Sequence, residues 1–413
     1  MPATLGSGQK SKDNINCHQE TWKMEAAFIV LIYVISVIGI GEIVKRAGVT
    51  SHITLIRSSP IDSLRGWLAT AVACHHTIIT YIWKTEGSWK DSESSVISNM
   101  GSIPVSMFFM ITAFLFFGKI YNKEPTWRDI LLSRLTRILP LYYTMVSVVV
   151  AFSIATTGFI INSTKGLAID VSKWMLFIGA PINGLSDSRN MLAGVQWTLI
   201  YESIFYLSLP LIAIFASKRK SLIATAFSLI TVTPICIAGY VKGIIRPELF
   251  SLFAIGFIPV IIKAKSPYMH NAMQTKLAAA ASLIIIFAAF TFTEKYSLLQ
   301  IALVGISFVP IALGNELFGI LRPEGSKSLG EISYSIYLIH GAVLYAMFSI
   351  ANITSFNLGI YTFSVYIPIV LLITSTISIL TYKYIESPWI SISKRYSRGY
   401  GSTCISQNLV RNE

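Results

Sequence analysis

The chain has 413 residues, of which 53% are hydrophobic and only 13% are charged. Soluble domains carry about a quarter charged residues, so this composition excludes a single water-soluble core and indicates that lipid surrounds most of the chain. The formal net charge is +13, but the basic residues stand in short segments between apolar runs, which is typical of membrane proteins and excludes nucleic acid as a partner.

Apolar runs succeed one another along almost the whole chain. Residues 1–23 are polar and are expected to form a disordered tail. The runs follow at 24–43, 63–83, 97–117, 138–157, 197–216, 221–241, 248–262, 277–293, 297–314, 334–351 and 362–385. Most approach the roughly 20 residues that a helix needs to cross about 30 Å of hydrocarbon.

This pattern predicts an all-α, polytopic transmembrane helical bundle of about 10–11 spans with no separate soluble domain. The run at 24–43 is then an extra N-terminal transmembrane helix, and residues 391–413 form a tail. A further apolar stretch at 171–184 is too short to span and is expected to lie at a membrane interface.

The lysines and arginines predict the orientation of the bundle. When the runs alternate across the bilayer, about two thirds of the 33 basic residues fall on the side that holds the loop 44–62. Cytoplasmic loops are enriched in Lys and Arg, so the C-terminal tail is predicted in the cytoplasm and the N-terminus outside. The longest external loop is then 158–196.

Three ionisable residues mark the start of the second run. Asp62 and Arg65 precede an apolar stretch that leads to His76, eleven residues after Arg65. Eleven residues complete about three helical turns, so Arg65 and His76 share one face, with Asp62 near it and His76 about 16 Å further along the axis. Charged groups inside a span are costly and therefore candidates for function, and a neutral imidazole accepts protons near neutral pH. Asp62, Arg65 and His76 are candidate catalytic residues; the alternative for His76 is a structural hydrogen bond to a neighbouring helix.

Arg134 and Arg137 form a second candidate site at a cytoplasmic membrane edge. Their spacing of three residues projects both side chains from one side of a helix. Two guanidinium groups placed in this way can clamp the phosphates of a nucleotide cofactor. We interpret them as cofactor-binding residues; the alternative is that they anchor the helix to lipid headgroups.

Further polar candidates lie in two later runs. Glu202 lies about 7 Å into its span from the external end, where a carboxylate has to be paired, protonated or in contact with water. It is a candidate catalytic residue, the alternative being a buried ion pair. Trp197 and Tyr201 beside it are candidate substrate-binding residues or interface aromatics. His340, about two turns into its span, is a third candidate substrate-binding residue that lines the same cavity, the alternative being that it packs in the core.

The cysteines carry no signal for a metal or a disulfide. Cys17, Cys74, Cys236 and Cys404 are scattered singly, without a C-x-x-C pair or a Cys/His cluster. We therefore expect neither a disulfide framework nor a bound metal.

Five short motifs occur in a fixed order between residues 60 and 390. They read D-x-L-R-G with a histidine eleven residues after the arginine, R-x-x-R-I-x-P-x-Y, W-[ST]-L-x-x-E-x-x-F-Y, S-Y-x-x-Y-L-x-H and E-x-P. The residues that form them are Asp62, Leu64, Arg65, Gly66, His76, Arg134, Arg137, Ile138, Pro140, Tyr142, Trp197, Thr198, Leu199, Glu202, Phe205, Tyr206, Ser333, Tyr334, Tyr337, Leu338, His340, Glu386 and Pro388. Together the motifs resemble the acyltransferase-3 family of membrane acyltransferases, with Thr112-Ala113 in place of the Ser-Gly that is usual in that family.

The resemblance implies a membrane O-acyltransferase of the type that modifies surface polysaccharides and O-antigen. Its donor would be acyl-coenzyme A, by default acetyl-CoA acting as a co-substrate. Its acceptor would be a hydroxyl of a cell-surface polysaccharide or a lipid-linked sugar, and its location a bacterial inner membrane. Two alternatives stay open: an acyltransferase for an antibiotic or lipid acceptor, and a transporter of a glycolipid or small solute, although no internal repeat of the kind common in transporters is visible.

The resemblance also implies roles for individual residues. Arg134 and Arg137 would bind the coenzyme A phosphates, while Asp62 and Arg65 shape the cytoplasmic mouth of a cavity. His76 would act at mid-membrane as the base for the acceptor hydroxyl or would assist acyl transfer. Glu202 would approach from the external side, to bind the acceptor or to tune the histidine.

Overall fold

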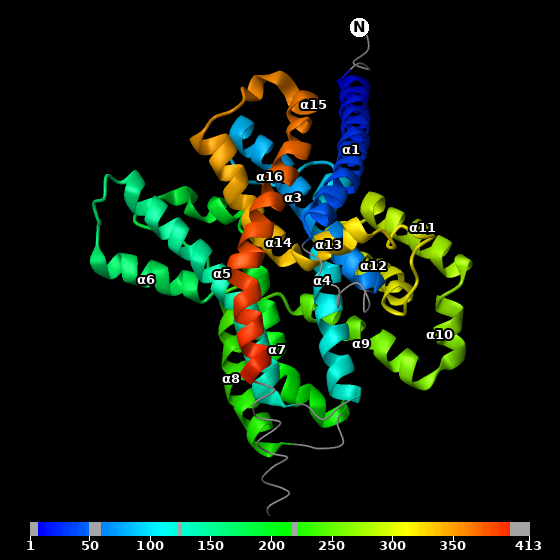
Figure 1. Ribbon diagram of the computed structural model, residues 1–413. Coiled ribbons are helices and arrows are strands. Elements are labelled where there is room, and N and C mark those ends of the chain that lie inside the picture. Colours follow the sequence, from blue (N-terminus) through cyan, green and yellow to red (C-terminus); the bar gives the residue numbers. More distant parts are fainter. Residues whose placement is uncertain (1–6, 49–58, 123–125, 217–220, 397–413) are drawn as a thin grey trace, which may run out of the picture.

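The computed structural model of the protein describes residues 7–48, 59–122, 126–216 and 221–396, and the side chains of residues 24–48, 59–122, 126–214 and 221–396 among them (Figure 1). These residues form helices and no β-strand, which confirms the predicted all-α fold. The expected tail beyond Tyr396 and residues 1–6 lie outside the described residues.

The helices follow one another with short connections. Their bounds are α1 Ser7–Arg46, α3 Pro60–Glu86, α4 Ser95–Asn122, α5 Trp127–Thr156, α6 Thr164–Met175, η1 Ser186–Leu192, α7 Trp197–Ala216, α8 Leu222–Val241, η2 Pro247–Leu249, α9 Phe250–Lys265, α10 Pro267–Met273, α11 Lys276–Phe292, α12 Leu298–Ala312, α13 Glu324–Glu331, α14 Ser333–Tyr345, η3 Ala346–Ile350, η4 Phe356–Leu358, α15 Gly359–Ser364, α16 Tyr366–Thr381 and η5 Tyr382–Glu386.

Eight helices of the described chain are long and apolar enough to cross a membrane, or nine if α10 and α11, bent by 65°, count as one broken span. The predicted polytopic bundle is confirmed, but the count is lower than ten or eleven. The helix α3 is 27 residues long, yet two adjacent histidines make it less apolar than the others. The helices α11 and α12, with 17 and 15 residues, are short for a single crossing.

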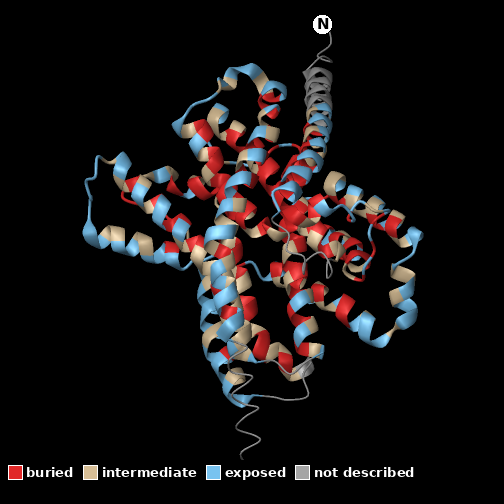
Figure 2. Ribbon diagram, viewed as in Figure 1, coloured by how far each residue is buried: buried red, intermediate tan, exposed pale blue. Residues whose placement is uncertain are grey.

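The distribution of buried residues agrees with a bilayer as solvent. Buried residues concentrate where α3, α4, α13 and α14 meet, whereas α8 at the periphery is largely exposed (Figure 2). The exposed face of α8 consists of large apolar side chains, among them Leu222, Ile223 and Ile230, which are 83%, 87% and 72% exposed. Apolar surface of this extent is stable only against lipid or another protein.

The N-terminal helix α1 belongs to the bundle. It begins at Ser7, so residues 7–23 are helical and the expected disordered tail is wrong for this stretch. The Tyr33 hydroxyl donates a hydrogen bond of 2.7 Å to the carbonyl of Trp67 on α3. Further along, a Cβ atom on Gly41 would lie 3.1 Å from the carbonyl carbon of Gly325 on α13. The absence of side chains at this crossing lets the two backbones pack directly.

The short helix α13 packs on α3 with the same close approach. A Cβ atom on Gly66 would lie 2.9 Å from the Cβ of Leu329, and one on Gly330 would overlap the carbonyl oxygen of Asp62. Only glycine allows this contact, which places the first turn of α3 against the end of α13. A single residue separates α13 from α14, so the first turn of α3 also lies against the start of α14.

The helices α3 and α14 run side by side in the same direction. Three pairs of residues mark their register. The Arg65 Nη2 atom donates to Ser333 Oγ at 2.9 Å, the rings of His76 and His340 stack with centroids 5.0 Å apart, and those of Trp83 and Tyr345 stack at 6.3 Å. Eighteen residues separate Arg65 from Trp83, a rise of about 27 Å, so the pair extends over a distance close to the hydrocarbon thickness.

Part of the segment 158–196 between α5 and α7, which the sequence predicts to be an external loop, folds back into the bundle. A Cβ atom on Gly341, beside His340 in the middle of α14, would meet the backbone of Leu192 and Ala193. The Tyr337 hydroxyl also donates a 3.4 Å bond to the carbonyl of Val195. The helix α7 therefore begins at the level of Tyr337, about halfway along α14, and the apolar stretch 171–184 belongs partly to α6 and partly to this inserted segment.

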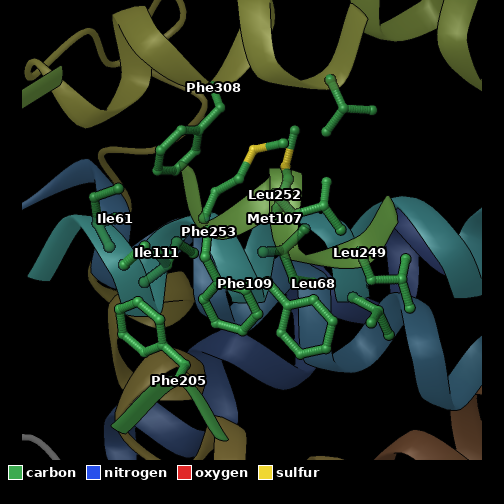
Figure 3. Packing of buried hydrophobic residues seen from close by; sticks show 14 of the residues in the cluster. Ile61, Leu68, Met107, Phe109, Ile111, Phe205, Leu249, Leu252, Phe253 and Phe308 are labelled. Carbon is green, nitrogen blue, oxygen red and sulfur yellow. The ribbon is translucent and has the colours of Figure 1, made fainter. Parts of the chain in front are cut away.

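Stacked phenylalanines join α7 to α4 and α9 (Figure 3). The ring of Phe253 stacks on Phe205 at 4.5 Å and on Phe109 at 4.8 Å, measured between centroids. Such pairs contribute about 0.5–1.5 kcal/mol each beyond their area. They hold α7 in place against α4 and α9.

The contact between α13 and α3 can be tested with glycine substitutions. We expect Gly330→Ala to lower the free energy of unfolding by about 1–3 kcal/mol, because the added methyl group overlaps the Asp62 carbonyl. Gly39→Ala is the matched control, since nothing lies within 4 Å of a Cβ at that helical position. The measurement is the melting temperature of the purified protein in detergent; equal melting temperatures for both variants would contradict the packing described.

Candidate functional site

A cavity of about 310 Å³ lies among α3, α4, α5, α7 and α14. Four basic side chains line it together with one carboxylate: Arg65, Lys119, Arg134 and Arg137, with Glu202. The remaining lining is aromatic, aliphatic or hydroxyl-bearing and includes Thr112, Thr198, Ser333, Tyr334 and Tyr337. The cavity thus carries an excess of positive charge.

Neutral contacts hold these cations in place. Arg65 donates to the Ser333 hydroxyl, and the Arg134 guanidinium lies 4.7 Å above the centre of the Phe116 ring, with its Nε atom lacking any partner among the described atoms. No carboxylate of the described residues lies within 4.0 Å of the four cations. A cluster of half-buried positive charges is unfavourable unless an anion neutralises it, so the cavity is suited to an anionic ligand.

Glu202 lies in the same cavity as the arginines. Its Oε2 atom accepts a 3.0 Å hydrogen bond from Tyr206, one turn further along α7. We expected Glu202 to approach from the external side, opposite the arginines, and this expectation is wrong. Because α7 begins halfway along α14, a residue near its start already lies at the level of the cations.

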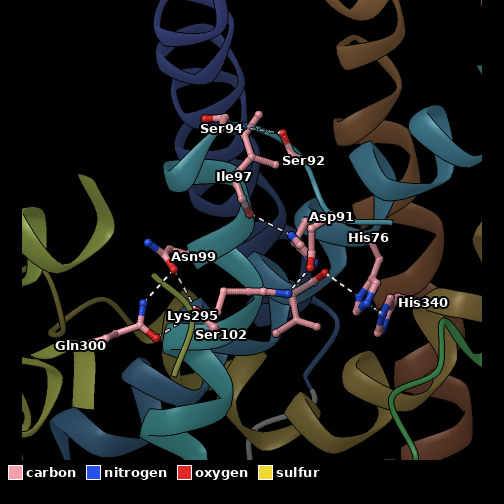
Figure 4. A network of polar contacts seen from close by, with 12 residues as sticks. His76, Asp91, Ser92, Ser94, Ile97, Asn99, Ser102, Lys295, Gln300 and His340 are labelled. Carbon is pink, nitrogen blue, oxygen red and sulfur yellow. Dashed lines mark hydrogen bonds and ion pairs between the residues drawn. The ribbon is translucent and has the colours of Figure 1, made fainter. Parts of the chain in front are cut away.

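Two histidines form a hydrogen-bonded pair beyond the cavity (Figure 4). The Nε2 atom of His340 lies 3.0 Å from the Nδ1 atom of His76. The Nδ1 atom of His340 lies 3.0 Å from the carbonyl oxygen of Ile336, and the Nδ1 atom of His76 lies 3.1 Å from that of Val72. His340 is fully buried and His76 is half-buried.

These contacts determine which nitrogens carry protons. A carbonyl oxygen only accepts hydrogen bonds, so Nδ1 of each neutral ring is protonated. The N–H group at Nδ1 of His76 then donates to two acceptors, the Val72 carbonyl and Nε2 of His340. The lone pair of His76 Nε2 is left free. Both rings are oriented by backbone carbonyls, and the arrangement leaves one nitrogen, on His76, able to accept a proton from a substrate.

Tyr337 connects the cation-lined cavity with the histidine pair. Its ring lines the cavity, lies 6.2 Å from the His340 ring between centroids, and packs against Phe108. Its hydroxyl lies 3.1 Å from Thr198 Oγ1 on α7. One face of α14 therefore presents Ser333, Tyr337 and His340 in succession, from the cations toward His76.

Three predicted site residues lie outside this arrangement. Asp62 accepts a 2.9 Å bond from the backbone N–H of Ser59 and caps the start of α3, so its side chain has a structural role there and does not line the cavity. Trp197 and Tyr201 pack with Phe109 in the core, where the Tyr201 hydroxyl accepts a 2.7 Å bond from the backbone N–H of Arg246. Neither lines the cavity, and their role as substrate-binding residues stays a prediction. They had appeared to be interfacial because α7 was expected to start at the membrane surface.

Lys119 and Tyr337 are site residues that sequence reasoning did not single out for a role. Lys119 follows Thr112 by seven residues and Phe116 by three, so the three share one face of α4. This periodicity was the sequence signal for Lys119, because it lies next to Thr112-Ala113, where the chain departs from the Ser-Gly of the family. No three His, Cys, Asp or Glu side chains of the described chain are placed to share a metal ion.

One of three comparisons with known proteins finds a match for this chain. No curated protein and no solved structure matches the chain. The model of the acyltransferase-3 family, described as an acyltransferase domain, matches residues 60–383, which include every residue of the cavity and both histidines but not α1. The chain therefore belongs to the acyltransferase-3 family and is a membrane acyltransferase.

Proposed function

We propose that the protein transfers an acyl group, acetyl by default, from acyl-coenzyme A to a hydroxyl of a cell-surface polysaccharide or lipid-linked sugar. The observation that carries the donor assignment is the excess of cations in the cavity. We further propose that the protein lies in a bacterial inner membrane with its C-terminus in the cytoplasm, the orientation indicated by its basic loops.

The cavity is suited to the phosphate end of coenzyme A. This cofactor carries a diphosphate and a 3′-phosphate, and Arg65, Arg134 and Arg137 offer planar donors that bind phosphate oxygens in pairs. Lys119, exposed at the rim, adds a fourth positive charge. A thioester chain leaving this cavity past Tyr337 then extends toward His76.

His76 supplies the proton transfer. Its free Nε2 atom takes the proton of the acceptor hydroxyl as that oxygen attacks the thioester carbonyl carbon and forms the new C–O bond. When the tetrahedral intermediate collapses, the C–S bond breaks and the sulfur leaves as a thiolate, which takes the proton from His76. The products are an ester and free coenzyme A. His340 accepts a hydrogen bond from His76 Nδ1–H and orients the ring throughout.

Replacing the base tests the reaction. We expect His76→Ala to lower the turnover of acetyl-CoA by roughly 10²–10⁴-fold, the usual contribution of a general base, while the protein still folds. The measurement is release of free coenzyme A from acetyl-labelled donor, with purified protein and a crude glycan extract as acceptor.

His270→Ala is the matched control, because His270 lies on α10 away from the cavity. A fully active His76→Ala protein would contradict the base assignment. If the unmodified protein neither binds nor consumes acetyl-CoA, the coenzyme A donor is wrong and transport becomes the better hypothesis.

A separate prediction follows if His340 is a positioning residue for His76. His340→Ala removes one of the two acceptors of His76 Nδ1–H and leaves only the Val72 carbonyl, so the ring of the base is oriented by one contact instead of two. We expect kcat to fall by roughly tenfold or more while the KM for acetyl-CoA stays within about twofold, since the residue acts on the chemical step rather than on donor binding. The pH–rate profile should also shift relative to the unmodified protein. An unchanged profile with reduced kcat would indicate a merely structural role.

The arginines should act on donor binding. We expect Arg134→Gln and Arg137→Gln each to raise the KM for acetyl-CoA by roughly 10–100-fold, because a charge-assisted hydrogen bond contributes about 1.5–3 kcal/mol. Arg395→Gln, an exposed arginine on the final helix, is the control and should leave the KM unchanged. The same kinetics with the acetyl thioester of dephospho-coenzyme A, which lacks the 3′-phosphate, would locate that group. The arginine that contacts the 3′-phosphate is the one whose Gln variant has the same KM for acetyl-CoA and for the dephospho donor.

A further inference from the structure

Three aromatic side chains lie next to His76 on the side away from the cation-lined cavity. The ring of Trp89 stacks on His76 with centroids 6.1 Å apart and planes 23° apart. Trp83 meets Trp89 edge to face at 5.5 Å and stacks with Tyr345 at 6.3 Å. Trp83, Trp89 and Tyr345 are all half-buried, and we call them the aromatic shelf.

The aromatic shelf continues the axis along which the donor site is built. Trp83 follows His76 by seven residues on α3, a rise of about 10 Å, in the direction opposite to Arg65. The register of α3 with α14 therefore places three layers in order: the cations, the histidine pair and the shelf. A donor bound at the cations and a second substrate bound at the shelf would meet at His76 from opposite sides.

Polar groups surround the aromatic shelf. The Lys84 ammonium lies 4.4 Å from the centre of the Trp83 ring. Asp187, from the inserted segment before α7, is close enough to act electrostatically on both Lys84 and the Tyr345 hydroxyl. An apolar aromatic surface edged by donors and acceptors matches a pyranose, which has an apolar C–H face and hydroxyls around its edge.

The loop that carries Trp89 is held in place by a polar network (Figure 4). Asp91 forms an ion pair with Lys295 from the connection between α11 and α12, and lies 3.9 Å from His75 Nε2. His75 in turn donates from Nδ1 to the carbonyl of Ile97 at 2.8 Å. These contacts tie the loop to α3 and to the connection between α11 and α12, and His75 joins α3 to α4. Aromatic residues that only anchor a helix at the bilayer surface point toward headgroups, whereas Trp89 is fixed against the ring of the base.

We propose that the aromatic shelf is the acceptor subsite and that it binds a pyranose by stacking. A hydroxyl of a sugar lying on Trp83 and Trp89 is then beside His76. This inference rests on the proposed acyl transfer and specifies its acceptor as a carbohydrate. It also assigns a function to a motif-free part of the sequence, since Trp83, Trp89 and Tyr345 belong to none of the five motifs.

The test uses the full chain in phospholipid nanodiscs, because sugar-based detergents would compete as acceptors. Acetyl-CoA is supplied with a panel of octyl pyranosides or with 1-octanol, and acetylated products are measured by mass spectrometry. We expect acetylation of pyranosides in preference to octanol. For Trp83→Leu we expect the KM for the pyranoside to rise about tenfold or more, equivalent to about 1.4 kcal/mol, while the KM for acetyl-CoA stays within about twofold.

Two further variants separate stacking from folding and from membrane anchoring. Trp83→Phe keeps an aromatic face and should keep the pyranoside KM within about threefold. Trp389→Leu removes an exposed tryptophan of the final helix, 49% exposed and distant from the shelf, and should change neither KM.

The outcomes separate this inference from the proposed function. Pyranoside acetylation with an unchanged KM in Trp83→Leu would overturn the acceptor subsite and leave the acyltransferase function standing. Equal acetylation of octanol and pyranosides would overturn the carbohydrate class. Absence of any acetyl-CoA consumption by the unmodified protein would overturn the proposed function and the subsite with it.

Discussion

The parallel contact between α3 and α14 is the constraint on which the site depends. A charged or strongly polar side chain inside a bilayer is unfavourable unless another group of the protein satisfies it. Arg65 meets this requirement at Ser333 and His76 at His340. Arg65 and His76 of α3 therefore both have their partners on the same neighbouring helix, and the two helices have one register in which both are satisfied. That register also determines where the donor cavity ends and where the aromatic shelf begins.

Small residues make this contact possible. The glycine crossings between α13 and α3 set the height of α14, because α14 begins directly after α13. Gly341 then lets the inserted segment before α7 reach the middle of α14. Van der Waals packing rather than a hydrophobic driving force holds helices together in lipid, so a methyl group at one of these crossings displaces whole helices. The positions of Tyr337 and Glu202 follow from the two crossings.

The charge and polarity of the side chains change from one end of the α3–α14 pair to the other. Cations without carboxylate partners gather at one end of the α3–α14 pair, neutral imidazoles occupy its middle, and aromatic rings with a polar rim occupy the other end. The gradient from charged to neutral to amphipathic surface suits a reaction whose donor is a polyanion and whose acceptor is uncharged. Under the proposed function, a thioester and a hydroxyl would enter from opposite ends of the α3–α14 pair and meet at the histidines.

The sequence by itself determined the all-α membrane fold, the family and the residues with costly charges, because hydropathy and helical periodicity act locally. It placed Arg65 and His76 on one face, since both lie on one uninterrupted helix. It did not place Trp197 and Tyr201 beside Phe109 in the core, nor Glu202 in one cavity with the arginines. These positions depend on where α7 starts relative to α14, which is decided by backbone contacts at Gly341 and Gly330 between segments far apart in the chain. The hydrogen bond between His76 and His340 joins residues 264 positions apart; no local pattern encodes it, and only the tertiary packing brings the two rings together.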